Sequence, residues 1–134
     1  MTIDISATDV SATTTTTTTT TTQAVCFAAP LLPGTTDRDR EEMLACGEGA
    51  RRGDHAASRR RHGITREAVW IQSTPVGDFA VVLLESRDLP RALHGLATSA
   101  EPFDAWFRSH LLAVHGMDLA EGMSLPEQVL DYRA

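Results

Sequence analysis

The sequence contains no lysine, and all 12 of its basic side chains are arginine. Without lysine, Schiff-base catalysis and phosphate binding by a P-loop lysine are both excluded. The sequence also lacks a glycine-rich phosphate loop, a dinucleotide-binding fingerprint and a serine, histidine and acid motif. Nucleotide chemistry and nucleophilic catalysis therefore have no basis in these residues.

Positive charge and cysteine are both scarce. The formal net charge of −6 disfavours nucleic acid as a partner, because such binding depends on neutralising phosphates. The two cysteines, Cys26 and Cys46, lack the spacing of a zinc, redox or disulfide motif, so we expect reduced thiols in the cytoplasm.

The histidines of the last predicted helix do not have the spacing of metal ligands. His110 and His115 would point about 140° apart on a helix, which predicts no metal site. A haem ligand stays open as an alternative, since one histidine suffices.

Long hydrophobic runs are absent as well. The longest run spans the six residues 79–84, whereas a membrane-spanning helix needs about 20. The apolar stretch 24–32 follows a polar tract and has no basic region before it, unlike a signal peptide. We therefore expect a cytoplasmic protein that does not bind membranes.

The composition is that of one folded domain with a low-complexity end. Hydrophobic residues make up 42% of the chain and charged residues 22%, which is typical of a globular protein. Ten consecutive threonines occupy positions 13–22. We expect residues 1–22 to form a disordered tail, because they have no apolar periodicity, and residues 23–134 to form a single domain.

Hydrophobic periodicity and turn residues predict seven segments of regular structure. Strands are expected at 23–29, 67–73, 78–85 and 127–132, with a hairpin turn at 74–77. Helices are expected from Thr36 or Asp37 to His62, with a break near the glycines of 47–53, and at 89–97 and 100–115. This order predicts an α+β fold with an antiparallel sheet of the ferredoxin-like βαββα(α)β type.

The expected sheet is apolar on both faces. In one middle strand Val69 and Ile71 alternate with Ala68 and Trp70, and the run 79–84 is apolar throughout. The helices of such a fold cover one face, so the other apolar face needs a different cover. A second copy of the chain would provide it, which predicts a homodimer.

Several short strings of the sequence resemble one known superfamily over about residues 24–132. These strings are RRHGITRE at 60–67, VWIQ at 69–72, GDFAVV at 77–82, EPFDAWF at 101–107 and VHGMDL at 114–119. They are similar to the dimeric α/β-barrel proteins related to antibiotic-biosynthesis monooxygenases, and most closely to an uncharacterised actinobacterial subfamily.

The resemblance implies that two ferredoxin-like protomers join their sheets into a barrel. It also implies a small-molecule pocket in each protomer, between the sheet and the helices. Members of the superfamily include cofactor-free oxygenases acting on polyketide quinols, cyclases, isomerases, lactone-forming enzymes, haem-degrading proteins and binding modules without known chemistry. We therefore expect a cofactor-independent enzyme of secondary metabolism acting on an apolar or aromatic small molecule. A non-catalytic metabolite-binding or regulatory module is the alternative, because fold does not fix function.

The predicted last helix carries the main candidates for chemistry. His110 is the candidate proton-transfer residue, since imidazole titrates near neutral pH. Trp106 lies four residues earlier on the same helical face and could line the cavity; a packed aromatic beside a hydrogen-bonded histidine is the alternative. His115 either caps the helix before Gly116 or contacts the ligand.

The remaining candidates lie on the strands and in an arginine-rich segment. Trp70 and Gln72 share one strand face and either contact the ligand or belong to the dimer core. Phe27, on the first strand, is placed with the ligand-contacting residues. Half of the arginines fall within 51–66, where they form either a solvated helix face or a binding site for an anion.

Overall fold

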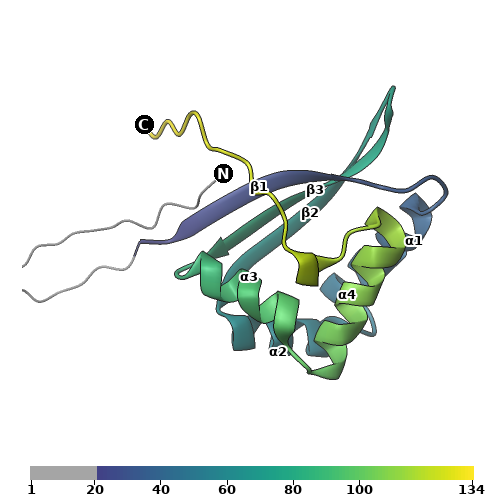
Figure 1. The fold of residues 1–134 in the computed structure, drawn as a ribbon, viewed down its shortest axis with the longest axis horizontal. Coiled ribbons are helices and arrows are strands. Elements are labelled where there is room, and N and C mark those ends of the chain that lie inside the picture. Colours follow the sequence, from purple (N-terminus) through teal and green to yellow (C-terminus); the bar gives the residue numbers. More distant parts are fainter. Residues whose placement is uncertain (1–20) are drawn as a thin grey trace, which may run out of the picture.

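Three antiparallel strands form one sheet in the order β1-β3-β2 (Figure 1). The computed structural model describes residues 21–134. The strands are β1 (Gln23–Pro30), β2 (Ile64–Thr74) and β3 (Gly77–Ser86). Val82 lies at the centre of the sheet, opposite Phe27 on one side and Val69 on the other. The three predicted strands and the tight hairpin between β2 and β3 are thus confirmed, although β2 begins three residues earlier than predicted.

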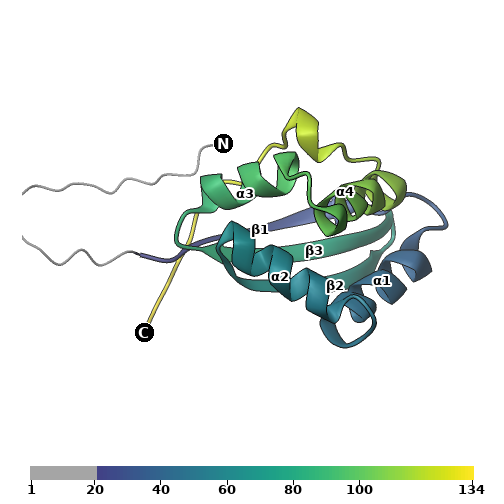
Figure 2. The same ribbon diagram turned by 90° about the horizontal axis from the view of Figure 1, so that it is seen from below.

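All the helices lie on one face of this sheet (Figures 1 and 2). They are α1 (Thr36–Glu48), α2 (Arg52–His62), α3 (Leu89–Thr98) and α4 (Pro102–His115), followed by the short 3-10 helix η1 (Leu119–Glu121). The prediction that the helices cover only one sheet face is confirmed.

Glycines end the helices where the sequence predicts breaks. Gly49 separates α1 from α2, and a Cβ at this position would lie 2.9 Å from the Cα of Ala45. Gly63 and Gly116 follow α2 and α4 with φ angles of 74° and 68°, in the left-handed region that favours glycine. The chain can therefore reverse tightly enough to bring every helix back onto the same sheet face.

The core lies between the sheet and the helices. Its buried centre combines strand and helix residues, namely Val25, Ile64, Leu84, Leu89, Ala92, Leu96 and Leu119. The predicted apolar stripe of α4 is buried as well: Phe103 and Phe107 form a second cluster with Cys46, Val114 is buried and Leu111 is half-buried. Burial of this apolar surface is the main stabilising contribution to the fold.

The opposite sheet face has no helix over it among the described residues. Val81 and Leu83 of β3 point to this face and are half-buried by their neighbours, whereas Trp70 of β2 is 52% exposed. We call the residues of β1, β2 and β3 on this side the open face. One apolar face of the sheet is thus left uncovered by the helices, as the sequence predicts, but the sequence does not determine that it is the face of Trp70, Val81 and Leu83.

The prediction of a last strand at 127–132 is wrong. Residues 122–134 have no regular secondary structure, and the segment runs away from the helices past β1 (Figure 1). Val129, Leu130 and Tyr132 are 86%, 80% and 81% exposed. A β-prone segment becomes a strand only beside an edge with which it can pair, and this segment pairs with none in residues 21–134. The described fold is α+β with a three-stranded sheet. The prediction of a disordered tail concerns residues 1–22, of which residues 1–20 lie outside the described part.

Candidate functional site

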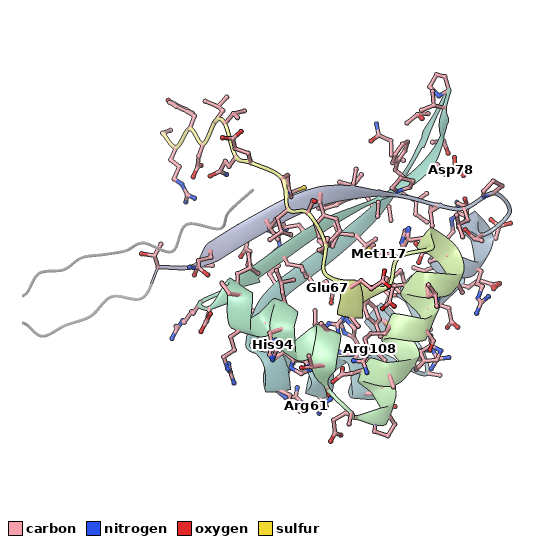
Figure 3. The ribbon with its side chains drawn as sticks, in the orientation of Figure 1. Arg61, Glu67, Asp78, His94, Arg108 and Met117 are labelled. Atoms are coloured by element: carbon pink, nitrogen blue, oxygen red, sulfur yellow. The ribbon has the colours of Figure 1, made fainter. Side chains whose placement is uncertain are left out.

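A small apolar cavity lies between the sheet and the helices. Its volume is about 60 Å³, and its wall contains residues of all three strands, of α1, α3 and α4, and of the segment that follows α4. Figure 3 shows Glu67 between the sheet and the helices and Met117 on the segment after α4. Among the described residues, the polar side chains in the wall are Asp39, Glu67 and His115. An apolar enclosure with a few polar groups is the usual form of a small-molecule site.

Asp39 brings a carboxylate oxygen with no partner to this cavity. The side chain projects from the first part of α1, and the residue is 2% exposed. Its Oδ1 lies 2.8 Å from Nε2 of His110, whereas its Oδ2 has no hydrogen-bond partner within residues 21–134. Buried polar atoms are normally hydrogen-bonded, because an unsatisfied one loses its hydration without compensation. Asp39 Oδ2 is therefore available to accept a hydrogen bond or a proton from a ligand.

His110 orients Asp39 and does not line the cavity. It is 1% exposed, and its Nδ1 also has no partner in the described part of the chain. Because a carboxylate oxygen accepts hydrogen bonds, the ring of His110 donates from Nε2 to Asp39 Oδ1. Asp39 thus lines the cavity, and His110 is hydrogen-bonded to it from outside the cavity wall.

Trp106 in turn holds His110. The two rings stack with centroids 5.4 Å apart and planes 16° apart. The guanidinium of Arg51 lies 3.6 Å from the centre of the Trp106 ring, and Glu42 accepts a hydrogen bond from Arg51 Nε at 3.0 Å. Trp106 is absent from the described cavity wall, so its contact with His110 restrains the imidazole and adds no surface to the cavity.

Glu67, the second acid in the wall, has hydrogen-bond partners at both of its carboxylate oxygens. Its carboxylate accepts hydrogen bonds from Arg59 Nε and Nη2 at 2.7 and 3.1 Å, and its Oε1 lies 2.7 Å from His55 Nε2. Burial alone would raise the pKa of Glu67, but the hydrogen bonds from His55 and Arg59 outweigh it and lower the pKa to about 2. Glu67 is thus a fixed anion that joins β2 to α2, and it is not free to exchange a proton near neutral pH.

This depressed pKa predicts how stability depends on pH. Because the folded pKa is about 2 against 4.5 ordinarily, the contribution of Glu67 is complete above pH 4.5 and is lost as the pH falls toward 2. The shift corresponds to a contribution of about 3 kcal/mol. Urea denaturation between pH 6 and 2 should therefore show that the free energy of unfolding decreases as the pH falls. Glu67→Gln should reduce the slope of this decrease. Glu127→Gln, in the exposed C-terminal segment, should leave the slope unchanged; an equal slope in both variants would contradict the assignment.

The other predicted site residues separate into two groups. Phe27 and His115 line the cavity, and Nδ1 of His115 lies 2.8 Å from the carbonyl oxygen of Pro30. Trp70 and Gln72 lie on the open face, because the alternating residues Val69 and Ile71 point to the helices. Contact between these two residues and a ligand in the cavity is therefore not supported.

The arginine-rich segment 51–66 contains both exposed and buried arginines. Arg52, Arg60, Arg61 and Arg66 are exposed, as a solvated face requires. Arg59 is 5% exposed, bound to Glu67 and 4.4 Å from the centre of the Phe107 ring. The buried member of the cluster thus completes an ion pair inside the protein, and no free anion site arises from it.

Sequence reasoning missed Asp39, the most distinctive group of the site. An acid in the first turn of a helix is ordinarily explained by the helix dipole. One signal was present: positions 39, 43 and 46 have helical spacing, and the other two residues are Met43 and Cys46, which places an acid on an apolar stripe.

Residues 21–134 contain neither a candidate metal-binding group nor a candidate membrane-spanning helix. These residues contain no group of three or more histidine, cysteine or acidic side chains that could hold a metal ion. None of their helices combines the length and the hydropathy needed to cross a membrane.

Comparisons with protein-family models, curated proteins and solved structures give no match to the chain. The class defined by the structure is an α+β protein with a three-stranded antiparallel sheet and four helices on one face.

Proposed function

We propose that the protein is a dimeric α/β-barrel protein that binds a small apolar or aromatic metabolite, such as a polyketide, and transforms it without a cofactor. The observation that carries this proposal is that Asp39 lines an apolar cavity and has a buried oxygen, Oδ2, without a partner in residues 21–134. Oxygenation, cyclisation or isomerisation of the metabolite is the class of reaction proposed.

Proton abstraction is the chemical step that this geometry favours. A phenol or enol hydroxyl that enters the cavity would donate to Asp39 Oδ2; its O–H bond breaks, the proton moves to Oδ2, and the electron pair stays on the substrate. The resulting enolate or phenolate can then isomerise, cyclise or react with molecular oxygen. His110 contributes by donating to Oδ1, which fixes the carboxylate in the orientation needed for transfer.

Asp39→Asn tests this proposal directly. The amide cannot accept the proton, so turnover of a verified substrate should fall by about 10²- to 10⁴-fold. The substrate is to be identified from small molecules that co-purify with the protein, by mass spectrometry. Asp37→Asn is the matched control, because Asp37 is on the same helix with its side chain 93% exposed, and should retain wild-type turnover. Wild-type turnover by Asp39→Asn would refute the role of Asp39.

His110→Ala separates orientation from proton transfer. Loss of the imidazole leaves Asp39 Oδ1 without its partner, so we expect turnover to fall while the carboxylate remains. The decrease should be smaller than that of Asp39→Asn. This order of effects reverses the assignment made from sequence, in which His110 itself transfers the proton.

The open face supports the dimeric part of the proposal. Its central residues are apolar, and a contiguous apolar patch in water favours association. Pairing two open faces would bury both and enclose a barrel between two layers of helices, as the resemblance to dimeric α/β-barrel proteins implies. The C-terminal segment with its exposed apolar side chains is then available to a neighbouring protomer.

A non-catalytic binding module is the alternative, and one observation favours it. Glu67 is fully paired, and burial raises the pKa of the Cys46 thiol to about 11, so that neither is a reactive group at neutral pH. A single acceptor such as Asp39 is enough to recognise a metabolite without changing it. Binding of the co-purified molecule with no product formed would establish this alternative.

A further inference from the structure

A second hollow adjoins the cavity. It is a groove of about 500 Å³ between α1, α2 and β2. We call it the outer groove; its wall contains Arg40, Met43, Leu44, Cys46, Gly47, His55, Glu67, Val69 and Ile71. Any role for it in ligand binding rests on the proposed function of the cavity.

The outer groove and the cavity share part of their walls. Met43, Glu67 and Val69 line both. Glu67 is held by Arg59 and His55, and Val69 belongs to a strand paired with β3, so neither can move aside easily. Met43 has an unbranched, flexible side chain and projects from a helix. Of the three shared residues, Met43 is therefore the one that can open a passage.

The two volumes indicate how a ligand must be accommodated. Pockets for small molecules measure roughly 300 to 1,000 Å³, and the cavity of about 60 Å³ is far smaller. The outer groove of about 500 Å³ falls within the usual range, but Asp39 is not part of its wall. A molecule of metabolite size that reaches Asp39 therefore needs space beyond the cavity, and the outer groove adjoins the cavity through their shared wall.

Gly47 gives the outer groove an open side. Glycine within a helix costs about 1 kcal/mol relative to alanine, so its presence near the end of α1 needs a reason. A Cβ at Gly47 would meet no atom of the described residues within 4 Å, so packing does not require glycine there. The missing side chain leaves the space in the groove empty.

We infer that the outer groove is the entrance and the second half of the ligand site. The ligand class is an elongated molecule with a hydroxyl at one end and an apolar tail. Its hydroxyl donates to Asp39 Oδ2, its body displaces Met43, and its tail lies in the outer groove beside Leu44 and Gly47.

Filling the groove without disturbing the fold tests this inference. Gly47→Leu places a side chain in the outer groove, whereas Gly53→Leu places the same side chain on α2, where a Cβ also meets no described atom within 4 Å. The probe is 4-hexylphenol, with binding measured by calorimetry and folding checked by thermal denaturation. We expect Gly47→Leu to weaken binding at least tenfold and Gly53→Leu to change it less than twofold.

Met43→Ala tests the passage between the outer groove and the cavity. It should accelerate association of 4-hexylphenol several-fold in stopped-flow fluorescence.

The outcomes distinguish this inference from the proposed function. Failure of 4-hexylphenol to bind the wild-type protein, or equal binding by Asp39→Asn, would refute the proposed site and the groove with it. Binding that depends on Asp39 but is the same in Gly47→Leu and Gly53→Leu would refute the groove alone. Binding that is weakened by Asp39→Asn and by Gly47→Leu, but not by Gly53→Leu, would establish both.

Discussion

Replacing Asp104 with alanine is expected to lower the free energy of unfolding by about 3–5 kcal/mol. Asp104 is on α4 and is 1% exposed. Its Oδ1 accepts a hydrogen bond from Ser58 Oγ, and its Oδ2 lies 2.8 Å from His62 Nε2 and accepts from Arg61 Nη2 at 3.2 Å. Because Ser58, Arg61 and His62 all belong to α2, alanine would remove the polar contacts between α2 and α4 and leave buried polar groups unsatisfied.

The pKa of Asp104 agrees with its role in joining α4 to α2. Burial alone would raise the pKa of Asp104, but hydrogen bonds from Ser58, Ser99, His62 and Arg61 outweigh it and hold the pKa well below its usual range. The carboxylate is therefore ionised at neutral pH. The ring of His62 is confined as well: a Cβ on Gly95 would lie 2.3 Å from its Nδ1, so α3 requires glycine at this contact.

Urea denaturation at pH 7 is the measurement for Asp104→Ala. Asp131→Ala is the control, because Asp131 lies in the exposed C-terminal segment, and it should change stability by less than about 0.5 kcal/mol. Asp104→Asn keeps the size and one acceptor, so its effect should be intermediate. A loss below about 1 kcal/mol for Asp104→Ala would show that the α2 and α4 contact does not depend on this carboxylate.

Leu83→Glu is expected to convert the proposed dimer into monomers. Leu83 lies on the open face of the central strand β3, opposite Cys26 of β1 and Ala68 of β2. In a two-fold symmetric dimer each substitution appears twice, so two carboxylates would be buried without partners. At several kcal/mol for each buried charge, the dissociation constant should rise at least 10³-fold.

Sedimentation velocity over a range of concentrations measures this effect. Leu112→Glu is the control, because Leu112 is an apolar residue on α4 that is already 53% exposed, and should leave the mass unchanged. A wild-type protein that sediments as a monomer at all concentrations would refute the pairing of open faces. A Leu83→Glu variant that remains dimeric would place the interface elsewhere.

The fold could be predicted from sequence where local patterns determine it. The apolar runs of β2 and β3, the turn between them, and the glycines after α2 and α4 are local signals, and the structure has each of them in place. The strand predicted at 127–132 depended on a distant edge with which to pair. Local β-propensity says nothing about that edge, which is why this prediction failed.

The site was less accessible to sequence reasoning for the same reason. The pairing of Asp39 with His110 joins residues 71 positions apart, and no local pattern links them. The proximity of Trp106 to His110 follows from helical spacing and could be predicted. Which strand face carries Trp70 could not, because both faces of β2 have apolar residues and only the tertiary fold decides which one meets the helices.

The helix α1 carries Asp39, Met43 and Gly47 at near-helical intervals, so the acceptor, the passage and the space for a ligand tail all belong to one short segment. The surface proposed for pairing is on the other side of the sheet and shares none of these residues. Natural variants can therefore diverge in what they recognise by changing a single helix, while selection for assembly acts on different positions altogether.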